Sequence, residues 1–388
     1  MNDTMAISPD SPDAISAAVK EARAANAPVV VRAGGTRSVD QPNNAVLSLA
    51  GLAGITRYDP GALTLIARAG TPLAEIEAAL ASEQQMLAFE PMDHRALLGT
   101  SGTPTLGGAM ATNASGPRRI LGGACRDFLL GTHFVNGEGT ILKNGGRVMK
   151  NVTGLDLSKL LCGAEGTLGI VTDIALKVLP LPAQSMTLTF ANLDAPAAVA
   201  LMTSALATPF EVSGAAYLPD MDGGTACLRI EGLDSQIGYR RDRLQAHFAQ
   251  HERAVIEGQA SAELWAGIRD AAPIAGRAGP VWRIGAKATD AAAIMRGLHE
   301  RLSVRVMLDW GGGLIWAQID PQDIAHIDTV KAILAPFASK ARLVRGSVSE
   351  RAAAAAAFAP AARIGKLSDA LRQQFDPDRL FNPHINAT

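Results

Sequence analysis

Near the start of the chain, the hydrophobic positions switch between the period of a helix and that of a strand. Residues 11–26 open with Ser-Pro and then carry apolar side chains at helical spacing, so they predict a helix. Residues 28–32 are a β-branched run that predicts a strand, and residues 63–69 predict another. Residues 72–80 then return to one apolar helical face. This alternation indicates a domain that mixes α and β structure.

The second half of the chain has a different pattern. Up to residue 182, residues 129–135, 140–142 and 167–179 predict strands around a glycine-rich turn at 136–139. From about residue 184 the predicted strands alternate with longer helices. The predicted strands there include 186–190 and 304–308, and the predicted helices are 196–206, 236–250, 290–302 and 361–375.

We therefore predict an α+β protein with three parts. Residues 1–182 form the first domain, residues 183–340 form a smaller α+β domain for capping or docking, and residues 341–388 return to the first domain. A hydrophobic content of 48% in 388 residues is enough to bury two cores.

Charge and targeting signals narrow the class of partner. The net charge of −1 gives no basic footprint for nucleic acid or for a lipid surface. Residues 1–13 lack the basic start and apolar core of a signal peptide, and no later segment has about 18 uninterrupted apolar residues. We expect a cytoplasmic protein without a transmembrane segment, with small molecules and proteins as its partners.

The cysteines also fit a cytoplasmic protein. Cys125, Cys162 and Cys227 are few, odd in number and far apart, which fits a reducing compartment. They form no Cys-x-x-Cys motif, so this chain alone cannot supply the thiolates that an iron–sulfur cluster usually needs. His247 and His251 lie four residues apart, but no third ligand motif accompanies them, and no metal site is predicted.

Two glycine clusters are the candidate binding elements. A predicted strand runs into residues 33–38, where two glycines and two hydroxyl residues offer backbone N–H groups to an anion. Residues 105–116 combine glycines, hydroxyls and an amide in the same way. Neither cluster is the Gly-x-Gly-x-x-Gly fingerprint of nicotinamide domains, and either one could be tight backbone packing. Together they predict a site for a diphosphate.

Five motifs in this order resemble the PCMH-type (vanillyl-alcohol-oxidase-like) FAD-binding family over roughly residues 10–182. They are Arg32-Ala33-Gly34-Gly35-Thr36-Arg37-Ser38, then Leu106-Gly107-Gly108 with Asn113-Ala114-Ser115-Gly116, then Arg126-Asp127-Phe128, then Lys150 with Gly154-Leu155-Asp156-Leu157, and finally Gly163-Ala164-Glu165-Gly166-Thr167-Leu168-Gly169-Ile170-Val171. The resemblance implies a two-lobed FAD domain in which the first loop and Gly107-Gly108 grip the pyrophosphate and the strand after Gly169 passes the adenine.

The resemblance also implies which residues of this sequence contact the cofactor. The residues implied to contact FAD are Ala33, Gly34, Gly35, Thr36, Arg37, Ser38, Pro91, Gly107, Gly108, Asn113, Ser115, Gly116, Arg126, Glu165, Gly169, Ile170 and Val171. Ala33 and His384 stand where the family commonly has glycine, and Leu155 replaces a frequent tyrosine. Relatives that tether their flavin often have a histidine where Thr36 stands, so non-covalent FAD is expected.

Further short sequence motifs are similar to those of the smaller FAD-binding subunits of bacterial glycolate oxidases. They include Ser115-Gly116-Pro117-Arg118-Arg119, Lys177-Val178-Leu179-Pro180, Asp309-Trp310-Gly311-Gly312-Gly313 and Phe375-Asp376-Pro377. This likeness implies oxidation of glycolate or a similar 2-hydroxy acid. The implied partners are a larger FAD-containing catalytic subunit and an iron–sulfur subunit, and through them the chain could be held at a membrane.

Individual charged and aromatic residues have competing interpretations. Arg126 is predicted to meet a flavin or substrate anion, whereas Glu165 is predicted to be a structural hydrogen-bond acceptor rather than a base. Arg118 and Arg119 fit an anion site or a solvated surface equally well. Trp310 is predicted to pack in the core rather than cover the flavin.

Three functions stay open at this stage. Catalytic relatives that oxidise 2-hydroxy acids carry the segment His-x-Gly-Asp-Gly-Asn-x-His, and residues 183–388 contain only scattered histidines. The catalytic residues are therefore not predicted. The chain is a flavin subunit of a multi-chain glycolate oxidase, a self-sufficient FAD enzyme acting on another hydroxy acid or alcohol, or a flavin-free structural subunit.

Overall fold

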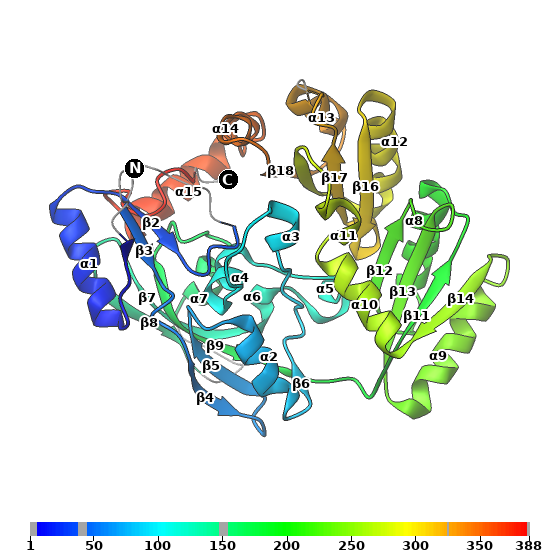
Figure 1. Cartoon of the computed structure of the whole chain (residues 1–388), viewed down its shortest axis with the longest axis horizontal. Helices are drawn as coiled ribbons and strands as arrows, with labels where there is room; N and C mark the ends of the chain where they lie inside the picture. Colours follow the sequence, from blue (N-terminus) through cyan, green and yellow to red (C-terminus); the bar gives the residue numbers. More distant parts are fainter. Residues whose placement is uncertain (1–5, 38–44, 147–153, 324–325, 386–388) are drawn as a thin grey trace.

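The computed structural model describes residues 6–37, 45–146, 154–323 and 326–385 (Figure 1). Ser38 and Lys150, which belong to the motifs above, lie outside these ranges. The structure is mixed α and β, as predicted, with a two-lobed first domain and a second domain built on its own sheet.

The first lobe holds a small parallel sheet. Helix α1 (Pro12–Ala24) is the predicted opening helix, and it starts where Ser11 Oγ accepts a hydrogen bond from Ala14 N at 3.3 Å. Strand β2 (Val29–Arg32) pairs in parallel with β3 (Ala45–Ser48), which pairs in parallel with β1 (Ala6–Ile7). Because β2 is the edge of this sheet, the loop after it is free to face the rest of the domain.

The second lobe is an antiparallel sheet whose middle strand is β9. In order across the sheet, its strands are β4 (Ile55–Asp59), β5 (Thr64–Arg68), β9 (Ile170–Lys177), β7 (Leu129–Val135) and β8 (Ile141–Gly145). The predicted strands at 63–69, 129–135 and 140–142 are confirmed. The predicted strand at 167–179 begins only at Ile170, because residues 163–169 form the glycine turn that precedes β9.

Short helices and one small strand pair connect the two lobes. They are α2 (Leu73–Ala81), α3 (Arg95–Leu98), α4 (Leu106–Thr112), α5 (Arg119–Gly122), α6 (Cys125–Phe128), α7 (Leu157–Leu161), and the pair β6 (Gln85–Met86) with β10 (Leu179–Pro180). One apolar core runs under both lobes and includes Ile15 and Val19 of α1 with Ile76 and Leu80 of α2.

The second domain is built on an eight-stranded antiparallel sheet. Its strands, in order across the sheet, are β14 (Arg253–Glu257), β11 (Gln184–Phe190), β13 (Thr225–Gly232), β12 (Val212–Leu218), β16 (Val304–Asp309), β17 (Leu314–Ile319), β15 (Val281–Gly285) and β18 (Lys340–Arg345). Its helices are α8 (Ala195–Leu206), α9 (Asp234–His247), α10 (Gly258–Arg269), α11 (Ala272–Ala275), α12 (Ala291–Arg301) and α13 (His326–Leu334), with the 3₁₀ turns η1 (Ala288–Asp290) and η2 (Trp310–Gly312).

Both faces of this sheet are covered. Ala215 and Tyr217 of β12 belong to the core under α8, α9, α12 and α13, whereas Ala216 and Leu218 belong to a second core with α10 and α11. The second core also takes in Met92 and Leu97 of the first domain. In Figure 1, α10 and α11 accordingly lie between the large sheet and α3.

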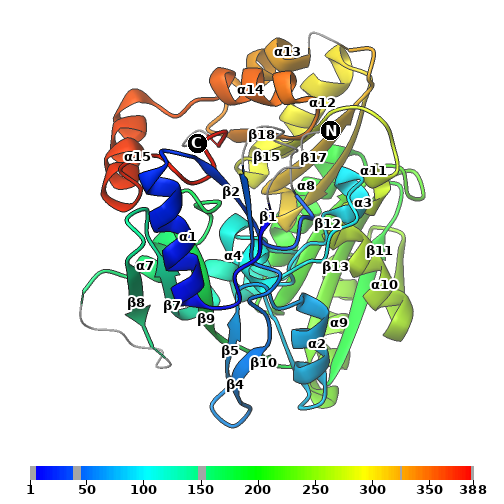
Figure 2. The same cartoon turned by 60° about the vertical axis from the view of Figure 1, so that its left-hand side comes forward.

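The chain ends by returning to the first domain. Strand β18 continues the large sheet past residue 340, and α14 (Val348–Ala357) packs on the same domain through Ala354. Helix α15 (Ala362–Phe375) then leads to Leu380 and Phe381, which are buried in the first core. Figure 2 shows α15 beside α1 and α14 near the large sheet. The domain boundaries at 182 and 340 stay a prediction.

Candidate functional site

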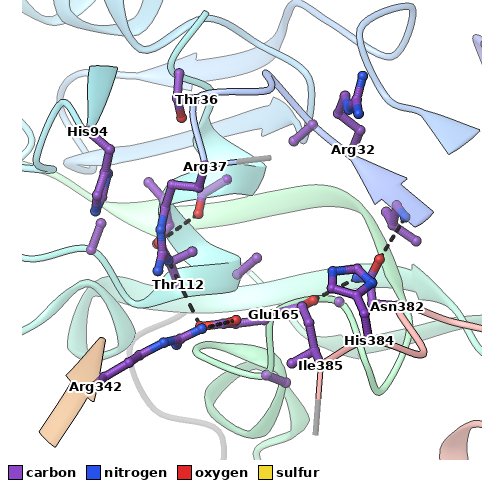
Figure 3. A pocket seen from close by; sticks show the side chains of 18 of the residues that line it. Arg32, Thr36, Arg37, His94, Thr112, Glu165, Arg342, Asn382, His384 and Ile385 are labelled. Carbon is purple, nitrogen blue, oxygen red and sulfur yellow. Dashed lines mark hydrogen bonds and ion pairs between the residues drawn. The ribbon is translucent and has the colours of Figure 1, made fainter. Parts of the chain in front are cut away.

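A cleft of about 950 Å³ lies where the two lobes of the first domain meet β18, α14 and the C-terminal segment (Figure 3). Both glycine clusters predicted from the sequence reach it. The predicted cofactor residues that line it are Ala33, Gly34, Gly35, Thr36, Arg37, Gly107, Gly108, Glu165, Gly169, Ile170 and Val171. Pieces of chain that are more than 100 residues apart in the sequence therefore surround one cavity.

Other predicted residues are close by but do not line the cleft. The amide oxygen of Asn113 accepts a hydrogen bond from Arg126 N at 3.1 Å, and the hydroxyl of Ser115 accepts one from Cys125 N at 3.0 Å. These bonds hold α6 in place. Pro91 and Gly116 are packed inside, and the Arg126 side chain is exposed. Their contact with FAD stays a prediction.

The glycines of the two clusters have different roles. A Cβ at Gly34 would lie 1.6 Å from Thr103 O, and one at Gly107 would lie 2.7 Å from Ala69 O, so these two positions are needed for backbone packing. A Cβ at Gly108 would meet only the hydroxyl of Thr105, at 3.2 Å, and Ala33 at 4.0 Å. Gly108 thus leaves space on the cleft side, which a bound group can use.

The first loop is held by the segment that precedes α4. Gly34 O accepts a hydrogen bond from Thr103 N at 2.8 Å, and Thr36 O accepts one from Thr100 Oγ1 at 2.8 Å. Gly35 has a φ of 75°, a left-handed conformation that favours glycine, whereas Ala33 has no positive φ. The alanine found where the family commonly has glycine is therefore compatible with this loop.

Glu165 links the two domains across the cleft. Its carboxylate pairs with both terminal nitrogens of Arg342 from β18, at 2.7 Å for Nη2, and Arg37 Nη1 lies 3.9 Å away. Figure 3 shows the arginines approaching Glu165 from different elements. Burial alone would raise the pKa of Glu165, but hydrogen bonds and charge from Arg342 outweigh it, and the pKa is lowered. Glu165 is an ionised acceptor, as the sequence suggested, rather than a base.

Cations dominate this end of the cleft. Arg283 of β15 lines it, and its guanidinium has cation–π contacts with Trp310 and Trp316 but no hydrogen bond or ion pair within the described ranges. Burial, together with the charges of Arg119, Arg37 and Arg342, lowers the pKa of Arg283 to about 10. The guanidinium still carries its charge near pH 7 and is free to bind an anion.

His94 lies beside these arginines and also lines the cleft. Burial, and then the charge of Arg37, lower the pKa of His94 to about 3, so its imidazole is neutral near pH 7. Because a general base works best with a pKa near the working pH, His94 is poorly suited to accept a substrate proton.

The opposite end of the cleft contains Arg32, Asn382 and His384 (Figure 3). The Nε atom of Arg32 and the Nδ1 atom of His384 are buried and have no hydrogen-bond partner in the described structure. Buried polar atoms are nearly always paired, so two unpaired ones on residues that line the same cavity fit a site that a ligand completes. With the open side of Gly108 and the cations, they fit a dinucleotide such as FAD.

Sequence reasoning missed one histidine of the first domain and the residues that the second domain and the C-terminus bring to this site. They are His94, Arg283, Arg342, Asn382 and His384. Arg283 and Arg342 lie on β15 and β18, two strands that the hydrophobic pattern did not predict. Trp310 does not line the cleft, and its indole donates to Gly116 O at 3.0 Å, which agrees with the predicted packing role.

Comparison with known proteins agrees with this geometry. Residues 4–145 match a family described as FAD binding domain. Glycolate oxidase subunit GlcE of Escherichia coli is 33% identical over 85% of this chain and 83% of its own length. D-lactate dehydrogenase of Archaeoglobus fulgidus is 31% identical, over 45% of this chain and 38% of the relative.

Solved structures show the same fold at low sequence identity. A p-cresol methylhydroxylase with substrate bound superposes with a TM-score of 0.73 at 13% identity and covers 98% of this chain and 90% of its own. An alkyldihydroxyacetonephosphate synthase gives a TM-score of 0.68 at 15% identity, covering 97% of this chain and 76% of its own. None of the described helices has the length and apolar content needed to cross a bilayer.

Proposed function

Since the chain belongs to the PCMH-type FAD-binding family of oxidoreductases, we propose that it is the FAD-binding subunit of a glycolate oxidase complex. In this complex, glycolate or a similar 2-hydroxy acid loses a hydride and a proton and becomes the 2-oxo acid. FAD, when bound, supplies the acceptor for the hydride. The electrons then pass to partner subunits.

The single observation that carries this proposal is the free guanidinium of Arg283 in the cofactor cleft. A 2-hydroxy acid presents a carboxylate, and Arg283 is a half-buried cation whose guanidinium forms no ion pair with a carboxylate among the described residues. Arg37 and Arg342 add positive charge nearby, although Glu165 already neutralises part of it. The cleft thus has a place for a small organic acid next to a place for a dinucleotide.

The chain's own side chains support a role within a complex. His94 lines the cleft and its imidazole is affected by the charge of Arg283, but its lowered pKa makes it a weak proton acceptor. The cysteines Cys125, Cys162 and Cys227 are all buried, and burial raises the pKa of Cys227 to about 12. None is poised as a thiolate ligand for an iron–sulfur cluster. The names of the Escherichia coli relative and of Bacillus subtilis glycolate oxidase subunit GlcD support a multi-subunit assembly.

The test is anaerobic mixing of the FAD-loaded chain with glycolate, with D-lactate and with buffer, while the oxidised flavin absorbance is followed. For the isolated chain we expect no rapid bleaching, whereas the co-purified complex with its larger flavoprotein and cysteine-rich subunit should bleach with glycolate. Rapid, substrate-specific bleaching by the isolated chain would instead identify a self-sufficient enzyme. A colourless chain that takes up no added FAD would identify a structural subunit.

A further inference from the structure

His94 brings an uncharged hydrogen-bonding ring to the arginine end of the cleft. It is the N-cap residue of α3 and lines the cleft, and Figure 3 shows its ring beside the Arg37 side chain. Burial, together with the charges of Arg37 and Arg283, lowers the pKa of His94 to about 3. The ring is therefore neutral near pH 7 and carries a proton on only one of its two nitrogens.

The proton on this ring has a partner in the backbone. The His94 ring donates its N–H to the carbonyl group of Met92. A neutral imidazole that donates through one nitrogen has the other nitrogen free as an acceptor. This second nitrogen is accessible, and no side chain in the described ranges donates a hydrogen bond to it. The cleft thus contains an acceptor whose donor has to come from a ligand or from water.

The backbone at this histidine is held between the two domains. Asp93 N donates to Asp270 Oδ1 at 2.9 Å, and Met92 is buried in the second core of the large sheet. At the other end of α3, Leu97 O accepts a hydrogen bond from Arg345 Nη1 of β18 at 2.8 Å. Helix α3 is therefore attached to the strand that also carries Arg342 of the cleft. These contacts fix the position of the ring before any ligand binds.

The arginines at this end of the cleft are arranged for an anion. Arg283 of β15 and Arg342 of β18 are direct cross-strand partners, and both line the cleft. Like charges opposite each other destabilise a sheet unless a negative charge compensates them. Glu165 compensates Arg342, whereas the Arg283 guanidinium has no carboxylate partner among the described residues. The carboxylate of a bound acid would supply the missing negative charge.

A small 2-hydroxy acid matches both unused groups. Its carboxylate is an anion, and its hydroxyl group, on the adjacent carbon, can donate one hydrogen bond. Arg283 offers donors for the carboxylate, and the free nitrogen of His94 offers an acceptor for the hydroxyl. The charge of Arg283 acts on the His94 ring, which indicates that the two groups are close. An acid without a hydroxyl group leaves the acceptor without a donor.

We propose that His94 accepts a hydrogen bond from the hydroxyl group of the substrate while Arg283 binds the carboxylate, so that the site selects 2-hydroxy acids over simple carboxylic acids. This inference rests on the proposed function. His94 holds the hydroxyl group without taking its proton, so it is a specificity-determining residue and not the base. One hydrogen bond between neutral groups should favour glycolate over acetate by roughly fivefold to tenfold.

The experiment is anaerobic titration of the FAD-loaded full-length chain with glycolate and, separately, with acetate, with the flavin spectrum as the signal. Only molecules that hold FAD give this signal, so partial loss of cofactor does not alter the ratio of the two dissociation constants. If glycolate bleaches the flavin, the concentration that gives half the maximal bleaching rate replaces its dissociation constant.

Two substitutions of His94 separate its acceptor from its bulk. His94→Leu, which removes both ring nitrogens, should bring the dissociation constants of glycolate and acetate to within about twofold of each other, with acetate binding as in the native chain. His94→Gln, which keeps a neutral donor and a neutral acceptor, should retain the native preference to within about twofold.

Two further variants are controls. Arg283→Met should weaken glycolate and acetate by the same factor, because both acids have the carboxylate. His247→Leu should leave both dissociation constants unchanged, since His247 lies at the end of α9, with its Nε2 3.0 Å from Ser204 Oγ, and is not a cleft residue.

The results that overturn the inference differ from those that overturn the proposed function. A native chain that binds glycolate and acetate equally, or a His94→Leu variant that keeps the native preference or weakens both acids equally, overturns the role of His94. Failure of the native FAD-loaded chain to bind either acid would instead overturn the acid site on which the proposed function rests.

Discussion

Arg229 of the large sheet and Glu90 of the first domain form a doubly hydrogen-bonded ion pair, with Nη1 and Nη2 at 2.8 and 2.9 Å from the two carboxylate oxygens. Arg118 joins them: it lies 3.0 Å from Glu90 and forms a second two-bond pair with Glu231. Their side chains are between 4% and 16% exposed. The two domains are therefore joined by a largely buried network of alternating charges.

We predict that Arg229→Met destabilises the protein by about 3–5 kcal/mol, because it leaves the buried carboxylate of Glu90 with only part of its charge compensation. Urea unfolding followed by circular dichroism measures the change. Arg305→Met is the matched control, because its pair with Asp220 is largely exposed and should contribute at most about 1 kcal/mol. Equal losses in the two variants would argue against the network.

Gly108→Val should abolish FAD binding while the chain stays folded. The branched side chain would point into the space that Gly108 leaves on the cleft side, with only Thr105 and Ala33 as other neighbours. Flavin content after reconstitution is the measurement, and circular dichroism reports folding. Gly238→Val is the control, because Gly238 is also helical and a Cβ there meets no atom within 4 Å. A native flavin content in folded Gly108→Val would contradict the assignment.

Arg283→Met should weaken binding of small carboxylates to the FAD-loaded chain. A charge-assisted hydrogen bond contributes about 1.5–3 kcal/mol, so the dissociation constant should rise roughly tenfold to a hundredfold. Oxalate, which resembles a 2-hydroxy acid but has no hydrogen to lose, can be titrated while the flavin spectrum is recorded. Arg351→Met, at the rim formed by α14, should have little effect. Unchanged oxalate affinity in Arg283→Met would place the acid site elsewhere.

The buried carboxyl group of Asp309 should make the free energy of unfolding depend on pH. Burial raises its pKa from 3.8 to about 7, although the hydrogen bond from Trp310 N opposes the rise. Between about pH 4 and pH 7, the folded chain keeps a proton that the unfolded chain has lost, so stability falls as the pH rises. The full effect is roughly 4 kcal/mol. Glu231 acts in the opposite direction below pH 4.5, since its pKa is lowered to about 2.

The check is the variant Asp309→Asn. Its free energy of unfolding should fall less between pH 5 and pH 8 than that of the native chain, and the variant should be more stable than the native chain at pH 8. Asp220→Asn, at an exposed carboxyl, serves as the control. If native and Asp309→Asn stabilities fall in parallel over this pH range, Asp309 is not the group responsible.

FAD should be released when the protein is precipitated with acid, because Thr36 offers no side chain for a covalent bond to the flavin. Absorbance of the supernatant at the flavin band measures release. Flavin that remains in the washed pellet would contradict a non-covalent cofactor.

The first domain could be predicted from sequence because its elements have strong local signals. Ser11 caps α1, β-branched residues mark β2, and the glycines before β9 mark its turn. In the sheet of the second domain, the predicted strands 186–190 and 304–308 are confirmed as β11 and β16. The pattern did not mark other strands such as β12 and β13, because strands covered on both faces lose the alternation of polar and apolar residues that identifies a strand. Residues 212–218 and 225–232 contain small and polar side chains that are nonetheless buried.

The same distinction applies to the site. Gly34, Gly35 and Gly108 stand in short motifs, so their place in the cleft was predictable. Arg283 and Arg342 reach the cleft only because β15 and β18 pair at the end of the large sheet, a contact between distant parts of the chain. Asn113 and Ser115 have the residue types of a phosphate site, yet their described hydrogen bonds fix the local backbone.

The return of the C-terminal segment to the first domain means that one wall of the cleft is synthesised much later than the rest. Asn382 bonds Val31 and the glycine turn at Glu165, and these contacts form the end wall of the cleft. Ribosomes make a chain from its N-terminus, so both lobes of the first domain emerge long before this wall exists. Until residue 382 has emerged, the cleft of a nascent chain therefore lacks this end wall.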